Sequence, residues 1–424
     1  MISGSVQENP MNKIIKLAKT APDWIIVLAV ILSTGTIWVQ NDQVVDRLSL
    51  IKLAVFTFAG IVGLLRIILR HQAVNRNNIL WLSLLIVLFA TTLLFSGSQP
   101  IPAFLVYGQI IGFMIYAASF RDKDEVMGVL EKFVQSMTLI ALISLFFYIF
   151  ASVFDVIQPT ERITLAEWQF LPYTNSYGGV YFEPQAISFL GYVGYRNCAI
   201  FCEAPMYAIC LCFALSIEIF FLRTNKKICI VLLAAILTTY STTAYFAVIL
   251  IYIFEAFKHG KRSDSVVKTI GIPLLLIGAV IAAAVLLEDK SGTDSYGVRF
   301  DHLIACFKVF ERTFPFGSGF GNNAVIAAAQ YEQGMSVGLP YFIAEGGLAA
   351  LLCVLLPICF CFLNIIRMHS AELLGFLVIT LWLFSITNVV SRAIAWMFIC
   401  MLIIAYPSLI DMDGGLTKWR KKLK

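Results

Sequence analysis

The chain alternates long apolar stretches with short polar connections. Most of the stretches are long enough to span a membrane, and they are continuous rather than alternating with a period of two, which indicates helices and not barrel strands. A backbone embedded in lipid must satisfy its own hydrogen bonds, so helices are the expected element. We therefore predict an all-α fold, a polytopic membrane helix bundle. The eleven apolar runs cover about residues 24–40, 48–69, 79–95, 101–120, 131–153, 204–222, 228–256, 269–287, 339–363, 372–390 and 393–410.

The positions of basic residues predict the topology. Lysines before the first run place the N-terminus in the cytoplasm by the positive-inside rule. Counting from there, the basic segment 258–268 and the lysine-rich C-terminus stay inside only if the run 228–256 crosses and returns. Its polar hexad TTYSTT, residues 238–243, is then the turn, and the alternative is one long tilted helix. We predict about twelve transmembrane segments in one domain, residues 1–424, with both termini cytoplasmic.

Composition agrees with this class. Of the 424 residues, 59% are hydrophobic and 13% are charged, and the formal net charge is +5. The ten cysteines have no metal-ligand spacing, and most lie inside apolar runs, where a thiol behaves as a small hydrophobic group. We predict no metal site. Cys198 and Cys202 lie near the predicted outer face, but a spacing of four on a helix disfavours a disulfide.

Arginine predominates among the basic residues that this topology places outside. An arginine fork grips phosphate through paired hydrogen bonds, whereas lysine acts as a point charge, so the bias points towards phosphate. The topology places nine basic residues outside, and six of them are arginines. The nine are Arg47, Lys52, Arg162, Arg196, Lys290, Arg299, Lys308, Arg312 and Arg392.

The first of two long outer loops, residues 154–203, is rich in aromatic residues, including Tyr195. Loops of this length are usually functional. Aromatic rings can face sugar rings, although they also collect at membrane interfaces without any ligand. The loop ends in YRNCAIFCEAP, where Arg196 and Glu203 share a face if the next helix has already begun. The arginine can hold a diphosphate and the carboxylate can accept a proton, or the two form a structural ion pair.

The second long outer loop, residues 288–338, contains RFDHLIACFKVFERTFPFGSGFG. Its Arg299 and His302 are three residues apart and share a helical face, so both are candidates for catalysis. Arg312 lies well round the same helix and is a weaker candidate for binding substrate, because a cation near a helix C-terminus is favoured without any ligand.

Glycines and two further charged residues complete the candidate set. Pro315 ends the predicted helix, and Gly317 and Gly319 allow sharp bends and a close approach to a ligand, whose phosphate their amides can cradle. No Walker-type lysine follows, so nucleotide chemistry is unsupported. Glu345 lies inside the next span, where a carboxylate is either functional or bonded to a neighbouring helix. Arg392, in the last outer turn, can reach a lipid phosphate or extend to the interface.

Four separated stretches together resemble the O-antigen polymerase and ligase superfamily, membrane glycosyltransferases that use undecaprenyl-diphosphate-linked sugars. YRNCAIFCEAP resembles the family's arginine-then-acid-proline entry to a span, and TTYSTTAYFAVIL its serine/threonine break. RFDHLIACFKVFERTFPFGSGFG resembles its arginine-led segment with proline and glycines, and PYFIAEGGLAAL its glutamate-glycine span start. The resemblance covers roughly residues 190–400, whereas residues 1–150 resemble only generic spans.

The resemblance implies an enzyme of a bacterial inner membrane that needs no metal or nucleotide cofactor. Arg196 and Arg299 become candidates for recognising the lipid diphosphate, with Glu203 and Glu345 as supporting acidic groups. The implied partners are an undecaprenyl-diphosphate-linked oligosaccharide, the lipid bilayer and, as a further candidate, a chain-length regulator, with no nucleic acid.

One difference between this chain and the ligases of the superfamily bears on which member it resembles. Its ligases resemble one another in a histidine shortly before the glutamate-glycine span, where this chain has Ser336 and Val337. His302 is the one histidine predicted to face outward, so either it or Glu203 is the candidate proton acceptor. We therefore favour a Wzy-type polysaccharide polymerase. The alternatives are a ligase that transfers the glycan to lipid A core, and a transporter or flippase of the lipid-linked sugar.

Overall fold

The computed structural model describes residues 10–41, 44, 47–71, 74–165, 173–189, 192–222, 225–258, 294–329 and 335–410. The apolar run predicted at 269–287 lies outside them. Within them the chain is mostly helical. The helices are α1 (Pro10–Ser33), α2 (Ile37–Gln40), α3 (Leu48–Leu69), α4 (Arg76–Phe95), α5 (Pro100–Ala118), α6 (Lys123–Phe147), η2 (Tyr148–Val153), α7 (Ala204–Ile217), η3 (Glu218–Leu222), α8 (Lys226–Thr238), α9 (Thr242–Lys258), α11 (Asp294–Thr313), α12 (Ala324–Ala329), α13 (Leu339–Met368), α14 (Ala371–Ile386), α15 (Ala393–Phe398), η5 (Ile399–Ala405) and α16 (Tyr406–Ile410).

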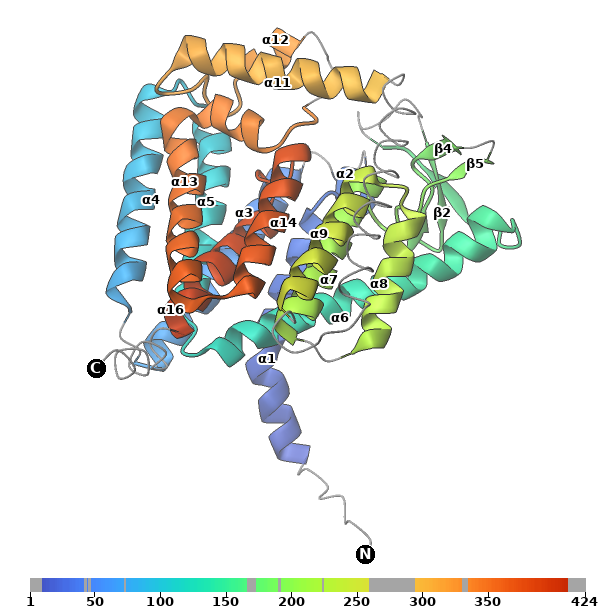
Figure 1. Ribbon diagram of the computed structural model, residues 1–424, viewed down its shortest axis with the longest axis horizontal. Coiled ribbons are helices and arrows are strands. Elements are labelled where there is room, and N and C mark those ends of the chain that lie inside the picture. The colour runs from blue at the N-terminus through green and yellow to red at the C-terminus, as the bar shows by residue number, and fades with distance from the viewer. Residues whose placement is uncertain are drawn as a thin grey trace, which may run out of the picture.

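Long helices form a bundle, and α11 and α12 lie across one end of it (Figure 1). We call this the capped end. Among the described residues, six helices are long and apolar enough to cross a membrane, and four shorter apolar helices accompany them. The chain is thus a helical membrane protein, as predicted, whereas the predicted number of about twelve segments is not established by these helices.

The run 228–256 is a helical hairpin. Helix α8 ends at Thr238 and α9 begins at Thr242, so the polar hexad contains the turn, as predicted. Tyr240 takes a positive φ of 50°, which reverses the chain. The hydroxyl of Thr239 donates to the carbonyl of Ile236 at 2.6 Å, and the Ser241 N–H donates to the same hydroxyl at 3.3 Å. Further backbone groups of the turn are satisfied from outside it, since the indole N–H of Trp382 in α14 donates to the carbonyl of Thr243 at 3.1 Å.

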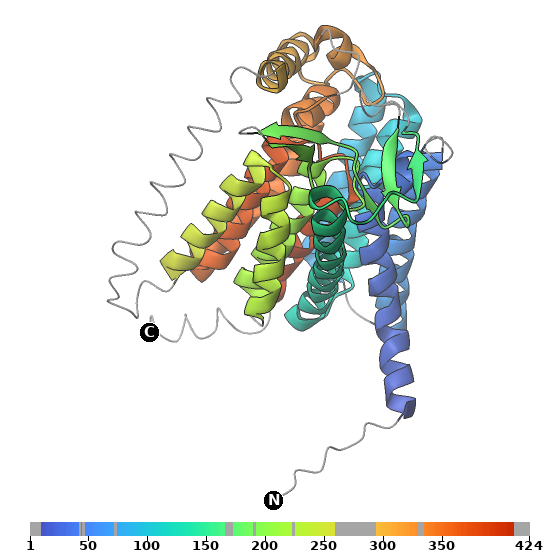
Figure 2. The same ribbon diagram turned by 90° about the vertical axis from the view of Figure 1, so that its right-hand side faces the viewer.

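The first outer loop contains five short strands, which corrects the all-α prediction for this segment. The first three strands form an antiparallel sheet, in which Arg162 pairs with Asn175. The last two form a hairpin. Their residues are largely β-branched or aromatic, types that favour extended backbone, but the strands are too short to give a period-two signal. The sheet lies beside the end of α6 (Figure 2). The strands are β1 (Glu161–Ile163), β2 (Thr174–Tyr177), β3 (Tyr181–Phe182), β4 (Ala186–Phe189) and β5 (Tyr192–Tyr195).

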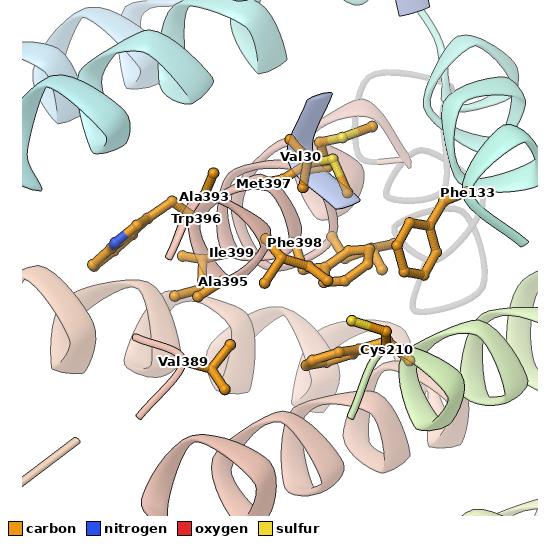
Figure 3. Packing of buried hydrophobic residues seen from close by; sticks show 14 of the residues in the cluster. Val30, Phe133, Cys210, Val389, Ala393, Ala395, Trp396, Met397, Phe398 and Ile399 are labelled. Carbon is orange, nitrogen blue, oxygen red and sulfur yellow. The ribbon is translucent and has the colours of Figure 1, made fainter. Parts of the chain in front are cut away.

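The centre of the bundle is the helix formed by α15 and η5. Every residue from Ala393 to Ala405 is buried. The ring of Phe398 lies 4.6 Å from that of Phe213 and 5.0 Å from that of Phe133, measured between centroids, and Figure 3 shows Phe398 beside Phe133. A helix that is apolar all round needs neighbours on every side. The other helices therefore pack around this one, and Arg392 directly precedes it at the capped end.

Charged side chains meet inside the bundle near the end opposite the cap. Asp23 of α1 is 7% exposed, and it accepts hydrogen bonds from Arg66 at 2.6 Å and from the Tyr116 hydroxyl at 2.5 Å. The ammonium of Lys132 lies 3.9 Å from the same carboxylate. These contacts join α1, α3, α5 and α6, which fixes the N-terminal helix against the bundle.

Asp23→Asn is expected to destabilise the protein by about 3–5 kcal/mol, because it leaves the Arg66 guanidinium buried beside a neutral amide. The matched control is Glu125→Gln, which breaks a pair with Arg70 in which both side chains are 30% exposed. That change should cost less than about 1 kcal/mol. Thermal unfolding in detergent measures both. Equal losses in the two variants would contradict a stabilising role for Asp23.

Candidate functional site: a cationic cluster at the capped end

Arg196 is held at the end of a helix. It follows β5, and its backbone N–H donates to the carbonyl of Gln185 at 2.9 Å. Its Nε donates to the carbonyl of Thr239 at 2.8 Å and its Nη2 to that of Tyr240 at 3.2 Å, just past the C-terminus of α8, where the helix dipole favours a cation. Two of the five N–H groups of the guanidinium are used in this way. The hairpin turn at 238–243 thus positions the arginine.

Glu203 is the carboxylate at the centre of the site. It interacts electrostatically with Arg196, Arg299 and Arg392. Glu203 is the N-cap of α7, so the helix begins after it and the predicted shared helical face with Arg196 does not exist. The two residues come together because the segment between them folds back, with the Cys202 N–H bonded to the carbonyl of Gly35 at 3.0 Å. Arg196 and Glu203 do interact, but the reason is the folding of the segment between them and not a shared helical face.

The other cations come from distant parts of the chain. Arg299 lies in the second turn of α11, and Arg392 is the N-cap of α15. Lys52, in the first turns of α3, interacts electrostatically with Arg392. Lys52 is one of the nine basic residues predicted to lie outside, but its span carries no distinguishing motif that would assign it to the site. We call Arg196, Arg299, Arg392 and Lys52, together with Glu203, the cationic cluster.

The charges of this cluster do not balance. Burial lowers the pKa of Arg196, Arg299 and Arg392 from the usual guanidinium value, and the charge of Glu203 partly opposes this in each case. The repulsion of Arg299 lowers the pKa of Arg196 further. Among the described residues, Glu203 is the carboxylate that interacts with Arg196, Arg299 and Arg392, and Lys52 adds a further positive charge beside Arg392, so this cluster attracts a multiply charged anion. The arrangement is suited to bind a phosphate or diphosphate group.

His302 contacts the segment that precedes α13. It is 2% exposed, and its Nδ1 accepts a hydrogen bond from the backbone N–H of Ser336 at 3.1 Å and lies 2.8 Å from the Ser336 hydroxyl. Burial lowers the pKa of the imidazole, while Asp301 opposes this. The ring therefore links α11 to the segment before α13. His302 and Arg299 are three residues apart in α11, as predicted, and the catalytic role of His302 stays a prediction.

Stability should depend on pH through His302. Because its pKa is lower in the folded chain, the unfolded chain binds the proton more readily, and stability present above about pH 6.5 is lost as the pH falls below that value. The slope is at most about 1.4 kcal/mol per pH unit. His302→Asn keeps an acceptor on the same carbon but does not titrate. As the pH is lowered below about 6.5, the unfolding temperature should fall more steeply for the natural chain than for His302→Asn. The same dependence on pH in both proteins would contradict this role for His302.

Gly317 and Gly319 serve packing and do not form a phosphate cradle. The N–H of Gly317 donates to the carbonyl of Thr313 at 3.0 Å, and that of Gly319 donates to the carbonyl of Glu345 at 2.8 Å. A Cβ on Gly317 would lie 2.4 Å from that same carbonyl oxygen. Their amides are already bonded within the protein, so the prediction that they bind substrate is corrected. The glycines let this loop lie directly against α13.

Glu345 anchors the same loop. It is 8% exposed and accepts a hydrogen bond from the Tyr341 hydroxyl at 2.9 Å, and its backbone carbonyl accepts one from the Gly319 N–H at 2.8 Å. Tyr341 lies in the same helix as Glu345, so this contact is not the predicted alternative of a bond to a neighbouring helix. The backbone of Glu345 positions the loop that ends α11, and the substrate-binding role of its side chain stays a prediction.

Two further predicted residues lie outside the cationic cluster. Arg312 is exposed in the last turn of α11, thirteen residues from Arg299, or about 20 Å along the helix axis. Tyr195 interacts with Glu183, Tyr173 and Arg162, and burial raises the pKa of its hydroxyl. The distance of Arg312 from Arg299 agrees with its rank as the weaker candidate, and the sugar-binding role of Tyr195 stays a prediction.

The aromatic loop is packed largely against the protein itself. Tyr181 is fully buried and stacks on Phe147 at 5.9 Å between centroids. Glu183, which the sequence analysis did not single out, is 3% exposed and accepts hydrogen bonds from Ser152 at 2.6 Å, Asn175 at 3.0 Å and Tyr177 at 2.9 Å. This buried carboxylate organises the small sheet. Tyr177 and Tyr181 therefore support the three-stranded sheet, whereas Arg196 follows the separate β4–β5 hairpin.

Cysteines and metals add no chemistry to this site. Cys198 and Cys202 are buried thiols that are not joined in a disulfide, and burial raises the pKa of Cys198 to about 12. Within the described part of the chain, no three His, Cys, Asp or Glu side chains are grouped to hold a metal ion. Comparison with protein families and with curated proteins gives no match, so the geometry of the cationic cluster carries the functional conclusion.

Proposed function

We propose that this protein is a polysaccharide polymerase, an O-antigen polymerase-like glycosyltransferase that transfers a glycan from one undecaprenyl diphosphate to another lipid-linked repeat unit. The observation that carries the proposal is the cationic cluster. Its four cations are partly buried at the capped end of a membrane helix bundle, and a membrane-anchored diphosphate has the charge and the location to fit it.

In the proposed reaction, a hydroxyl oxygen of the acceptor sugar bonds to the anomeric carbon of the donor glycan. The bond from that carbon to the phosphate oxygen breaks, and undecaprenyl diphosphate leaves with the electron pair. Arg299 and Arg392 stabilise the negative charge that develops on the leaving group, and Arg196 is fixed in place to do the same. Glu203, the only carboxylate in the cluster, accepts the hydroxyl proton.

The orientation that fits this function places the capped end outside the cytoplasm of a bacterial inner membrane, with both termini inside. The described ends of α1 and α16 both lie on the side of the bundle opposite the capped end, in support of this (Figure 1). A transporter or flippase of the same lipid is the less favoured alternative, because the cationic cluster lies at one end of the bundle and transport sites are expected near the middle of the membrane.

A ligase is the second candidate. The superfamily resemblance associates ligases with a histidine shortly before the glutamate-glycine span, and His302 contacts Ser336 in that segment although it comes from α11. A ligase would need that imidazole as its base, so His302→Gln should abolish its activity. In the polymerase, His302→Gln should leave polymer length unchanged at matched protein levels.

Deletion of the gene followed by analysis of lipopolysaccharide tests the proposal. We expect a core that carries a single repeat unit, because ligation continues while polymerisation stops. Bare core with stranded lipid-linked polymer would instead assign the ligase. Lipid-linked repeat units retained on the cytoplasmic face would assign the flippase, and unchanged lipopolysaccharide would contradict all three.

A further inference from the structure

Helix α11 carries a stripe of exposed aromatic side chains. Phe300 is 56% exposed, Phe307 is 64% exposed, and Phe314, directly after the helix, is 61% exposed. A spacing of seven residues brings side chains back to nearly the same side of a helix. The residues of α11 that are buried against the rest of the protein lie on another side: His302, Ala305, Cys306 and Val309. The stripe, Phe300, Phe307 and Phe314, is therefore turned away from the bundle.

The stripe continues into a surface that faces lipid. Phe316, 44% exposed, stacks on Phe95 at 5.1 Å between centroids. Phe95 and its neighbour Leu94 are 57% and 74% exposed at the end of α4, one of the membrane-crossing helices. Twenty residues of α4 extend about 30 Å, the thickness of the hydrocarbon layer, so Phe95 lies at the boundary of that layer. The stripe starts at this level.

Helix α11 lies across the membrane-crossing helices rather than along them (Figure 1), so its whole length stays near this boundary. We propose that α11 is an interfacial helix whose stripe inserts among the acyl chains of phospholipids, just beneath their headgroups. The proposal is independent of the reaction assigned above. It also explains how Arg299, next to Phe300, is kept at the depth of lipid phosphates.

The charges of α11 specify the kind of lipid contact. Among its exposed charged side chains, Asp301 and Glu311 are balanced by Lys308 and Arg312. The described helix therefore has no excess of cations to attract anionic headgroups. The association should rest on apolar burial and should be insensitive to headgroup charge.

Photocrosslinking of the full-length protein tests this surface. The photoreactive residue p-benzoylphenylalanine replaces Phe307 in one variant and the exposed Lys308 of the same helix turn in the other. Both are reconstituted in vesicles of phosphatidylethanolamine and phosphatidylglycerol with a trace of undecaprenyl phosphate, and adducts are identified by mass spectrometry. Only monodisperse preparations are compared, and a third variant at Phe300 replaces the first if that one misfolds.

We expect acyl-chain adducts several-fold more abundant at position 307 than at 308, and unchanged when phosphatidylglycerol is omitted. Equal labelling at the two positions would overturn the proposal. Adducts to a second copy of the chain, or to the isoprenoid in preference to phospholipid, would also overturn it by assigning the stripe to another occupant. None of these outcomes alters the test by gene deletion, so failure of this inference is separable from failure of the proposed reaction.

Discussion

Arg299→Ala is expected to reduce glycan polymerisation by about a hundredfold or more, the loss seen when one preorganised group that stabilises developing charge is removed. Arg299 interacts with Glu203 at the centre of the cationic cluster and comes from a helix that contributes no other cation to it. Glycan chain length on gels, at matched protein level, measures the effect in cells. Arg392→Ala should act in the same way.

The chain offers a matched control on the same helix. Arg312 is an exposed arginine in the last turn of α11, about 20 Å along the axis from Arg299. Arg312→Ala should leave chain length unchanged. Arg299→Lys should restore activity only partly, because an ammonium group supplies charge without a planar fork. Full-length polymer from Arg299→Ala would remove this residue, and with it the charge argument, from the mechanism.

Gly347→Ala is expected to destabilise the protein by about 2–6 kcal/mol, the sum of backbone strain and overpacking. Gly347 has φ 61° and ψ −146° inside α13, a conformation that residues with a Cβ avoid. An added Cβ would lie 2.3 Å from the carbonyl carbon of Phe316 and 2.4 Å from the carbonyl oxygen of Pro315. Both are backbone atoms of the loop that follows α11. This loop packs against α13 where the helix is interrupted at Gly347, so an added Cβ would push the loop away from α13.

Gly178→Ala separates the two contributions. Gly178 also has a positive φ, 59°, but nothing lies within 4 Å of a Cβ built there. Gly178→Ala should therefore lower the free energy of unfolding only by the cost of backbone strain, about 1–2 kcal/mol. Unfolding temperatures in detergent compare the two variants. If Gly347→Ala is no less stable than Gly178→Ala, the contact between the loop and α13 does not constrain the fold.

The tight contact at Gly347 also explains why the glycine-rich segment was hard to interpret. From its letters, FGSGFG fits a phosphate loop and a packing loop equally well. The two differ only in the partners of the backbone amides, and the Gly319 amide is bonded to the carbonyl of Glu345, which follows in the chain after 25 intervening residues. No local pattern contains that information.

The sequence alone determined that this is a helical membrane protein and that the run 228–256 turns at its polar hexad, because burial in lipid and the satisfaction of backbone groups act over a few residues. It also identified Arg196, Glu203, Arg299 and Arg392 as candidate site residues, because charged residues are rare in an apolar chain and these four lie at or near the ends of spans. Only the tertiary structure decided that these four interact in one cluster with Lys52, that His302 contacts Ser336, and that the Glu345 carbonyl binds the Gly319 amide. Those outcomes depend on how distant helices pack, which is a property of the whole chain.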